Sequence, residues 1–213
     1  MPVRFDKREY RKIAADDMEV RKGENGEMVV EGYATTFNMP YRLMGDDKIT
    51  VNEQVDRNAF SGTDMSDVIM QYDHEGRVFA RIRNNTLQVT PDERGLFVRA
   101  DLGGTDLGRG LYQEISGGYT DKMSFGFIVA EDKREVTEVE GKTRLDRIIL
   151  GVSKVFDVSA VSLPANNNTA IEASVRGFDG VIEEARAERL KMQEMELKRQ
   201  RLTVRAKALG GKE

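Results

Sequence analysis

The clearest structural signal in the chain is the stretch TLQVTPDERGLFVRADL, residues 86–102. Apolar and polar residues alternate over 86–90 and again over 96–102, which is typical of strands with one buried face. Between them, residues 91–95 contain Pro, Asp and Gly, a composition that favours a turn. The stretch therefore predicts a β-hairpin within a β-rich domain.

Outward from this hairpin, strand-like patterns continue through most of the chain. We expect strands over residues 28–37, 65–72, 78–82, 122–130, 143–150 and 154–163. Apolar residues at helical spacing predict a helix over 105–115, whereas 38–50 is predicted as a loop and 51–60 as a short helix or turn. Many short strands with one or two helices indicate a β-rich α+β fold, and we predict a closed β-barrel with flanking helices.

The charge distribution divides the chain into three segments. Residues 1–27 are charge-dense and are predicted as an N-terminal arm, residues 28–175 as the folded domain, and residues 176–213 as a charged helical C-terminal tail. Residues 181–209 contain neither Gly nor Pro, which predicts one long exposed helix. Because its apolar residues keep no sustained heptad, we expect this helix to serve in assembly or tethering rather than in a coiled coil.

The composition argues against several classes of function. With 33 basic and 37 acidic residues the net charge is −4, so no nucleic-acid partner is expected. The absence of cysteine excludes thiolate catalysis, and a single histidine argues against a zinc site, so we predict neither metal nor cofactor. There is no leader pattern and no run of about 18 apolar residues. We therefore expect a soluble intracellular protein without a membrane partner.

The single histidine, His74, lies in the polar stretch Gln71–Arg77. An imidazole has an unperturbed pKa near working pH and can take a proton from a hydroxyl nucleophile, so His74 is a candidate general base. The alternative is a surface histidine in a turn. A catalytic role requires a nucleophile nearby.

The candidate nucleophile is Ser124, which stands between a methionine and a phenylalanine in an alternating stretch with Gly126. This pattern places Ser124 on a strand, and Gly126 permits close approach of other groups. A core serine without a catalytic role fits the same pattern. Oxyanion donors would be backbone N–H groups of this stretch or a nearby arginine, with Arg77, Arg81 and Arg83 as candidates.

A third group would hold the histidine in one tautomer, and Asp157 is the best placed acid. It lies in an apolar strand-like stretch, where a buried carboxylate needs a partner. The alternative is that the strand turns Asp157 outward to solvent. Three other acids compete for the role, namely Asp73, Glu75 and Asp121.

In this order, these stretches resemble the prohead serine proteases of tailed bacteriophages, which are distantly similar to the herpesvirus assemblins. The resemblance covers roughly Val29–Ala173, and its motifs are Glu31–Ala34 with Phe37, Arg57–Phe60, Gln71–Arg77, Arg94–Leu96, Lys122–Phe127 and Phe156–Asn166. It implies that His74 is the base and Ser124 the nucleophile. The family often has an acid at the place of Asp157, whereas the herpesvirus relatives use a second histidine, which this chain lacks. The implied fold is the herpesvirus-protease-like β-barrel.

The resemblance also implies a function and partners. It predicts a serine endopeptidase that works through an acyl-enzyme and cleaves the scaffold or delta segment of the major capsid protein, and itself, during prohead maturation. The place of action would be the assembling procapsid in the host cytoplasm, and a homo-oligomer is expected by the same analogy. The main alternative is a non-catalytic capsid-assembly or scaffolding protein with the same fold, which the presence of both His74 and Ser124 argues against. A structural tail-tube protein and a metal-dependent hydrolase are weaker alternatives.

Overall fold

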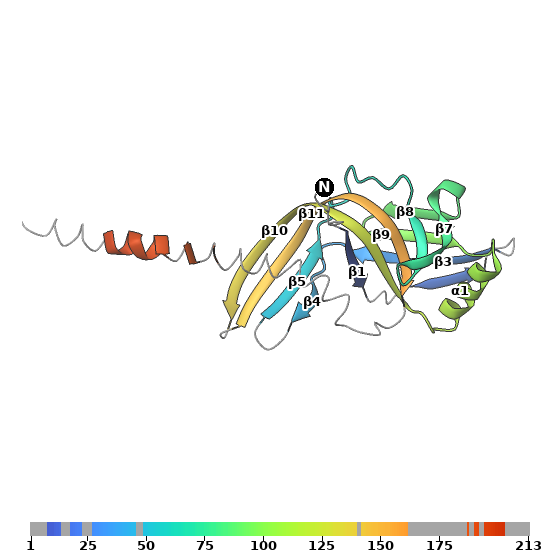
Figure 1. The fold of residues 1–213 in the computed structure, drawn as a ribbon, viewed down its shortest axis with the longest axis horizontal. Coiled ribbons are helices and arrows are strands. Elements are labelled where there is room, and N and C mark those ends of the chain that lie inside the picture. Colours follow the sequence, from blue (N-terminus) through green and yellow to red (C-terminus); the bar gives the residue numbers. More distant parts are fainter. Residues whose placement is uncertain are drawn as a thin grey trace, which may run out of the picture.

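The structure, a computed structural model, describes residues 8–13, 18–22, 27–45, 49–139, 142–161, 187, 190–191 and 194–202. In these residues the chain is β-rich and forms two sheets (Figure 1). The elements are, in chain order, β1 (Glu9–Ile13), β2 (Glu19–Lys22), β3 (Met28–Thr36), β4 (Tyr41–Gly45), β5 (Ile49–Val55), β6 (Ile69–Tyr72), β7 (Glu75–Arg81), the 3-10 helix η1 (Ile82–Asn84), β8 (Leu87–Pro91), β9 (Gly95–Asp101), α1 (Asp106–Ser116), β10 (Lys122–Val139) and β11 (Lys142–Val161).

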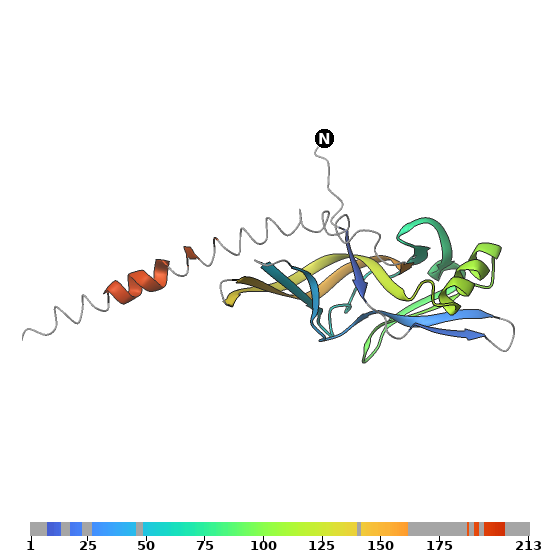
Figure 2. The same ribbon diagram turned by 90° about the horizontal axis from the view of Figure 1, so that it is seen from below.

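The long strand β11 organises the larger, seven-stranded sheet. Its order is β1-β10-β11-β5-β4, with β6 also paired to β11 and β7 paired to β6. Strand β11 is antiparallel to β10 and parallel to two other strands, to β5 in its first half and to β6 near its end. The smaller sheet has the order β2-β3-β9-β8 and lies with α1 at one end of the domain, while β4 and β5 lie towards the other (Figures 1 and 2).

Two elements predicted from local patterns are confirmed. The hairpin is formed by β8 and β9, and its turn is closed by the Asp92 side chain, which accepts from the N–H groups of Arg94 at 2.7 Å and Gly95 at 3.0 Å. The helix is α1, and its first turn is capped by the Thr105 side chain, which accepts from the Gly108 N–H at 3.0 Å. In both cases a short polar side chain satisfies backbone donors that the element itself leaves free.

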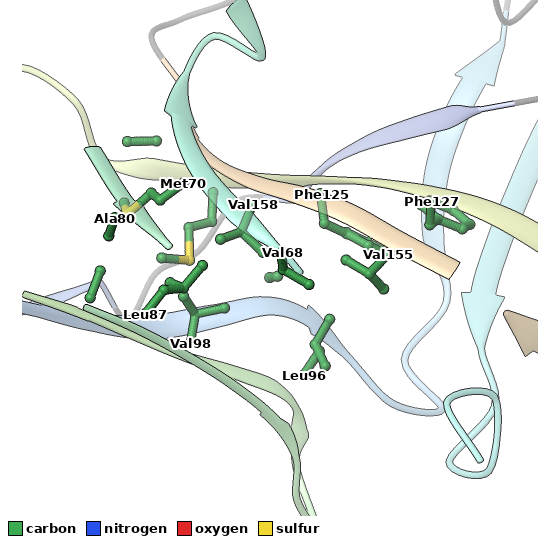
Figure 3. Packing of buried hydrophobic residues seen from close by; sticks show 14 of the residues in the cluster. Val68, Met70, Ala80, Leu87, Leu96, Val98, Phe125, Phe127, Val155 and Val158 are labelled. Atoms are coloured by element: carbon green, nitrogen blue, oxygen red, sulfur yellow. The ribbon is translucent and has the colours of Figure 1, made fainter. Parts of the chain in front are cut away.

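The hydrophobic core lies between the two sheets. In Figure 3 the larger sheet contributes Met70, Phe125, Phe127, Val155 and Val158, and the smaller sheet contributes Leu87, Leu96 and Val98. Helix α1 adds two buried side chains, Leu111 and Ile115, to the same cluster. Burying each large aliphatic or aromatic side chain stabilises the fold by about 1.5–3 kcal/mol, so this interface holds the sheets face to face.

The predicted closed β-barrel is wrong. In the described ranges, the edge strands of the larger sheet are β1, β4 and β7, those of the smaller sheet are β2 and β8, and no ladder joins these edges. The sheets are connected by the core and by an isolated parallel bridge between Phe37 and Val55. Alternation in a sequence shows which residues share a strand face, but closure depends on which edge strands meet, and a local pattern does not encode that.

The predicted helices are found only in part. In the described part of the domain α1 is the one α-helix, so the plural flanking helices are not found. A long C-terminal helix is not shown either: residues 187, 190–191 and 194–202 are helical and exposed, and the rest of 176–213 lies outside the described residues, as does the boundary at 175. No described helix is long and apolar enough to cross a membrane.

Further differences concern the first third of the chain. Residues 38–50, predicted as a loop, contain β4 and the start of β5. Residues 51–60, predicted as a short helix or turn, begin with the rest of β5 and form a turn only at 57–60. Strand β5 escaped prediction because its inward-facing residues are Val51, Glu53 and Val55, so that a buried charge interrupts the apolar alternation. The predicted arm, residues 1–27, contributes β1 to one sheet and β2 to the other.

Candidate active site

The predicted base lies at the tip of the β6–β7 hairpin. Tyr72 pairs with Glu75, so the connection is the two-residue turn Asp73–His74. Both residues have positive φ, 49° and 62°, as a type I′ turn requires, and the twist of paired strands favours that turn. Aspartate and histidine tolerate the left-handed backbone better than most residues, so this local sequence permits His74 to sit there.

Strand β11 brings this turn to the predicted acid and serine. Strand β6 runs parallel to β11, and the Asp73 N–H donates to the Ala160 carbonyl at 3.0 Å. On the other side of β11, β10 places Ser124 opposite Ser159, which is two residues from Asp157. Since strand side chains alternate between faces, Ser124, Asp157 and Ser159 share one face of the sheet.

The three predicted site residues form one hydrogen-bonded chain. The distance from His74 Nε2 to Ser124 Oγ is 2.6 Å, and from His74 Nδ1 to Asp157 Oδ2 it is 2.5 Å. With a neutral imidazole protonated at Nδ1, Nδ1 donates to the Asp157 carboxylate and Nε2 accepts from the serine hydroxyl. All three groups are largely enclosed: the His74 side chain is 11% exposed and that of Asp157 4%.

This arrangement has the connectivity of a serine-protease triad. The family profile described as caudovirus prohead serine protease matches residues 16–183, which is most of the chain. The chain belongs to this family. A search of curated proteins found no match. Among solved structures, the capsid assembly protease gp21 of bacteriophage T4 is similar at 10% sequence identity and a TM-score of 0.40, covering 72% of this chain and 99% of that one.

The carboxylate of Asp157 is held by a second group in this prohead-protease chain. The Ser159 hydroxyl donates to Asp157 Oδ2 at 3.1 Å and is itself fully buried. Ser159 was not among the predicted site residues, although it stands two residues after an acid on a predicted strand and so shares the face of Asp157. A carboxylate that accepts from both a hydroxyl and an imidazole has its orientation fixed.

Gly126 makes room for this carboxylate. It pairs with Asp157 on β11 and with Tyr10 on β1. A Cβ atom at position 126 would lie 2.3 Å from Asp157 Oδ1 and 2.8 Å from Tyr10 Cε1, both well inside contact distance. The close approach that the sequence suggested at Gly126 is thus made by two side chains, one from each neighbouring strand.

The three acids that compete with Asp157 for the role of orienting His74 lie elsewhere. Glu75 is exposed, and Asp121 is exposed and pairs with Lys122 at 3.0 Å. Asp73 occupies the turn itself.

The three candidate arginines were proposed as oxyanion donors. Arg81 and Arg83 both contact Asp67, at 2.5 Å and 3.1 Å, and Arg77 is exposed on β7. None of the described contacts brings these arginines to Ser124.

The described ranges contain no group of three or more His, Asp or Glu side chains placed to hold a metal ion.

Proposed function

We propose that this chain is a capsid-maturation endopeptidase in which Ser124 is the nucleophile, His74 the general base and Asp157 the group that orients it. The observation that supports this most directly is the hydrogen-bonded chain from Ser124 through His74 to Asp157. A scaffolding protein that kept only the fold would have no need for a hydroxyl, an imidazole and a carboxylate at 2.6 Å and 2.5 Å on a buried face.

The proposed reaction is acyl transfer in two steps. Ser124 Oγ attacks the peptide carbonyl carbon while its proton passes to His74 Nε2, and the same proton then goes to the leaving amine as the C–N bond breaks. In the second step water loses a proton to Nε2 and attacks the ester carbon, and Nε2 then returns the proton to Ser124 Oγ as the ester C–O bond breaks and the new carboxyl terminus leaves. His74 and Ser124 thereby return to their starting states.

Asp157 acts on the imidazole throughout this cycle. Each step passes through an imidazolium, and a carboxylate 2.5 Å from Nδ1 stabilises that positive charge. It also fixes the tautomer in which Nε2 is free to accept a proton. The Ser159 hydroxyl keeps the carboxylate aimed at Nδ1 rather than at solvent.

Access to the nucleophile requires a movement. Ser124 is 0% exposed, so a peptide carbonyl cannot reach Oγ until neighbouring parts of the chain shift. We therefore infer that the structure represents a resting form and that cleavage follows a rearrangement. The isolated protein should react slowly with a serine-directed fluorophosphonate, and faster under the conditions in which it cleaves capsid protein.

The proposed substrates are the scaffold or delta segment of the major capsid protein and the protease itself. The proposed place is the interior of the procapsid in the infected cell, with the chain acting as a homo-oligomer. Family membership supports the capsid protein as the partner.

The test is co-expression with the cognate capsid protein, followed by intact-mass measurement of both chains. We expect wild type to shorten the capsid protein and Ser124→Ala and His74→Ala to leave it intact. Ser153→Ala is the matched control, because this serine lies on β11 but is exposed, and in the described contacts its hydroxyl donates only to the Ile128 carbonyl, at 3.2 Å. Shells that form with uncleaved capsid protein in all four cases would favour the scaffolding alternative.

A further inference from the structure

The ring of Tyr10 packs directly on the imidazole of His74. The two ring centroids are 4.4 Å apart and the rings are tilted by 57°. Tyr10 lies on β1, opposite Gly126, and Asp157 lies opposite Gly126 on the other side. Because Gly126 has no side chain, Tyr10 and Asp157 lean towards each other across β10 and both contact His74. The imidazole is thus held at Nδ1 by a carboxylate and on one side by an aromatic ring.

Strand β1 lies at the edge of the sheet, yet it is fixed by buried charge. Its next residue, Arg11, points to the opposite face and is 1% exposed. There it contacts both carboxylate oxygens of Glu53 on β5, with Arg11 Nη2 at 2.8 Å from Oε2. Arg147 on β11 donates to the same Glu53 at 3.0 Å and to Glu9 on β1 at 2.7 Å and 3.0 Å. We call these four residues the ion-pair cluster.

The ion-pair cluster fixes the position of β1 on the sheet. Glu53 is 0% and Arg147 3% exposed, so each charge is separated from water and depends on its partners. Burial tends to raise the pKa of Glu9, but hydrogen bonding and charge from Arg147 and Arg11 outweigh it and hold that pKa below its ordinary value. Displacement of β1 would leave Glu53 and Arg147 with fewer partners in the interior. The cluster therefore opposes sliding or fraying of the strand that carries Tyr10.

We propose that Tyr10 is a positioning residue that holds the imidazole of His74 in the orientation that reaches both Asp157 and Ser124. The ion-pair cluster keeps β1 in place, so that Tyr10 stays against the imidazole. The proposal rests on the catalytic roles given to His74 and Ser124 above. It assigns a function to the N-terminal strand, which lies more than 60 residues before the turn that it supports.

The test compares Tyr10→Leu, Tyr10→Phe and Tyr33→Leu with wild type. Tyr10→Leu removes the aromatic ring, Tyr10→Phe keeps it, and Tyr33→Leu removes a tyrosine of the smaller sheet that packs on Phe97. We expect Tyr10→Leu to lower kcat about two- to tenfold, the factor that an aromatic contact ordinarily contributes, with KM unchanged. Tyr10→Phe and Tyr33→Leu should match wild type.

A second measurement reports on His74 itself. This is the single histidine of the chain, so the NMR signal of its Nδ1–H proton needs no assignment among others. In Tyr10→Leu this proton should exchange with water faster than in wild type, because the ring that helps to hold the imidazole on Asp157 is gone. Tyr10→Thr, which keeps a strand-forming residue on β1, provides the same measurement if the leucine variant folds poorly.

The outcomes separate this inference from the proposed function. Unchanged kcat and unchanged Nδ1–H exchange in Tyr10→Leu would overturn the positioning role while Ser124→Ala still lost activity. A rise in kcat/KM would also overturn it, because the ring would then be covering the site rather than aligning it. Cleavage that survives Ser124→Ala and His74→Ala would remove the proposed function, whatever Tyr10 does.

Discussion

The two sheets of this protein differ in the number of polar side chains that they bury. In the smaller sheet, β3, β8 and β9 bury apolar side chains, with Thr35 the one buried polar residue of its described strands. The larger sheet buries six polar or charged residues, namely Arg11, Glu53, Ser124, Arg147, Asp157 and Ser159. An unpaired buried polar group destabilises a fold, and each of these six has a hydrogen-bond or ion-pair partner. Both sheets contribute apolar side chains to the core, but the larger sheet also buries the polar groups of the candidate site and of the ion-pair cluster.

The largest expected effect is on catalysis in the larger sheet. Asp157→Asn keeps the shape of the side chain but replaces the carboxylate beside Nδ1 with an amide. This change favours the tautomer of His74 with its proton on Nε2, which cannot accept the proton of Ser124. We expect kcat to fall by about 10⁴-fold with little change in Tm. The measurement is cleavage of a capsid-derived peptide. Asp146→Asn, on the same strand but paired with Arg144 at the surface, is the control, and a similar loss there would argue against a specific role.

Next comes the stability that the ion-pair cluster provides. Glu53→Gln leaves Arg11 and Arg147 buried with one carboxylate fewer, so the free energy of unfolding should fall by about 3–5 kcal/mol. Urea denaturation followed by far-UV circular dichroism measures it. Glu135→Gln, at an exposed position of β10, should change stability little. An unchanged free energy of unfolding in Glu53→Gln would mean that the larger sheet tolerates unpaired buried charge. The difference between the sheets in buried polar residues would then matter less for stability than we propose.

In the smaller sheet we expect a loss of stability with little change in catalysis. Leu96→Ala removes a fully buried side chain of the core, and we expect a loss of about 3 kcal/mol in the free energy of unfolding. Measured at a temperature where the variant is folded, kcat should stay within about twofold of wild type. A large drop in kcat with intact folding would show that the smaller sheet also tunes the site.

Gly126→Ala adds one methyl group to the larger sheet and tests whether Asp157 needs the space that Gly126 leaves. The added Cβ would meet Asp157 Oδ1 at 2.3 Å and push the carboxylate from Nδ1, so we expect kcat to fall by about 10²-fold. Gly151→Ala on β11 is the matched control, because its nearest neighbour would lie 3.5 Å away. Steady-state kinetics on both variants decide the point, and equal activities would refute the tight fit at position 126.

The smallest effect concerns pH. The pKa of Glu9 lies below its ordinary value of 4.5 in the folded protein, so its interactions stabilise the fold above pH 4.5 and are lost as the pH falls through the lowered value. The free energy of unfolding should therefore drop less steeply below pH 4.5 in Glu9→Gln than in wild type. Parallel acid titrations of both proteins measure the slopes, and identical slopes would show that Glu9 contributes nothing through its charge.

Much of the site could be anticipated from the sequence, but its supporting residues could not. His74 stood out as the single histidine, and Ser124 because its stretch Lys122–Phe127 resembles the prohead serine proteases. Tyr10 lay in a charged segment with no visible pattern, and its contact with His74 depends on pairing between β1 and β10 across more than 100 residues. The burial of Glu53 could not be predicted, because a charged residue in a strand pattern indicates a surface position unless its buried partners are known.

By itself the sequence determined the hairpin of residues 86–102 and the helix α1, and it indicated the residues that we propose as reacting groups. These depend on local backbone periods, on turn and capping residues, and on side-chain chemistry, all of which short stretches carry. Only the tertiary structure decided that the sheets stay open and that Ser124 and Asp157 meet a histidine 50 and 83 residues away. The reason is that strand partners are chosen by hydrogen bonding and packing between distant segments, which no local pattern specifies.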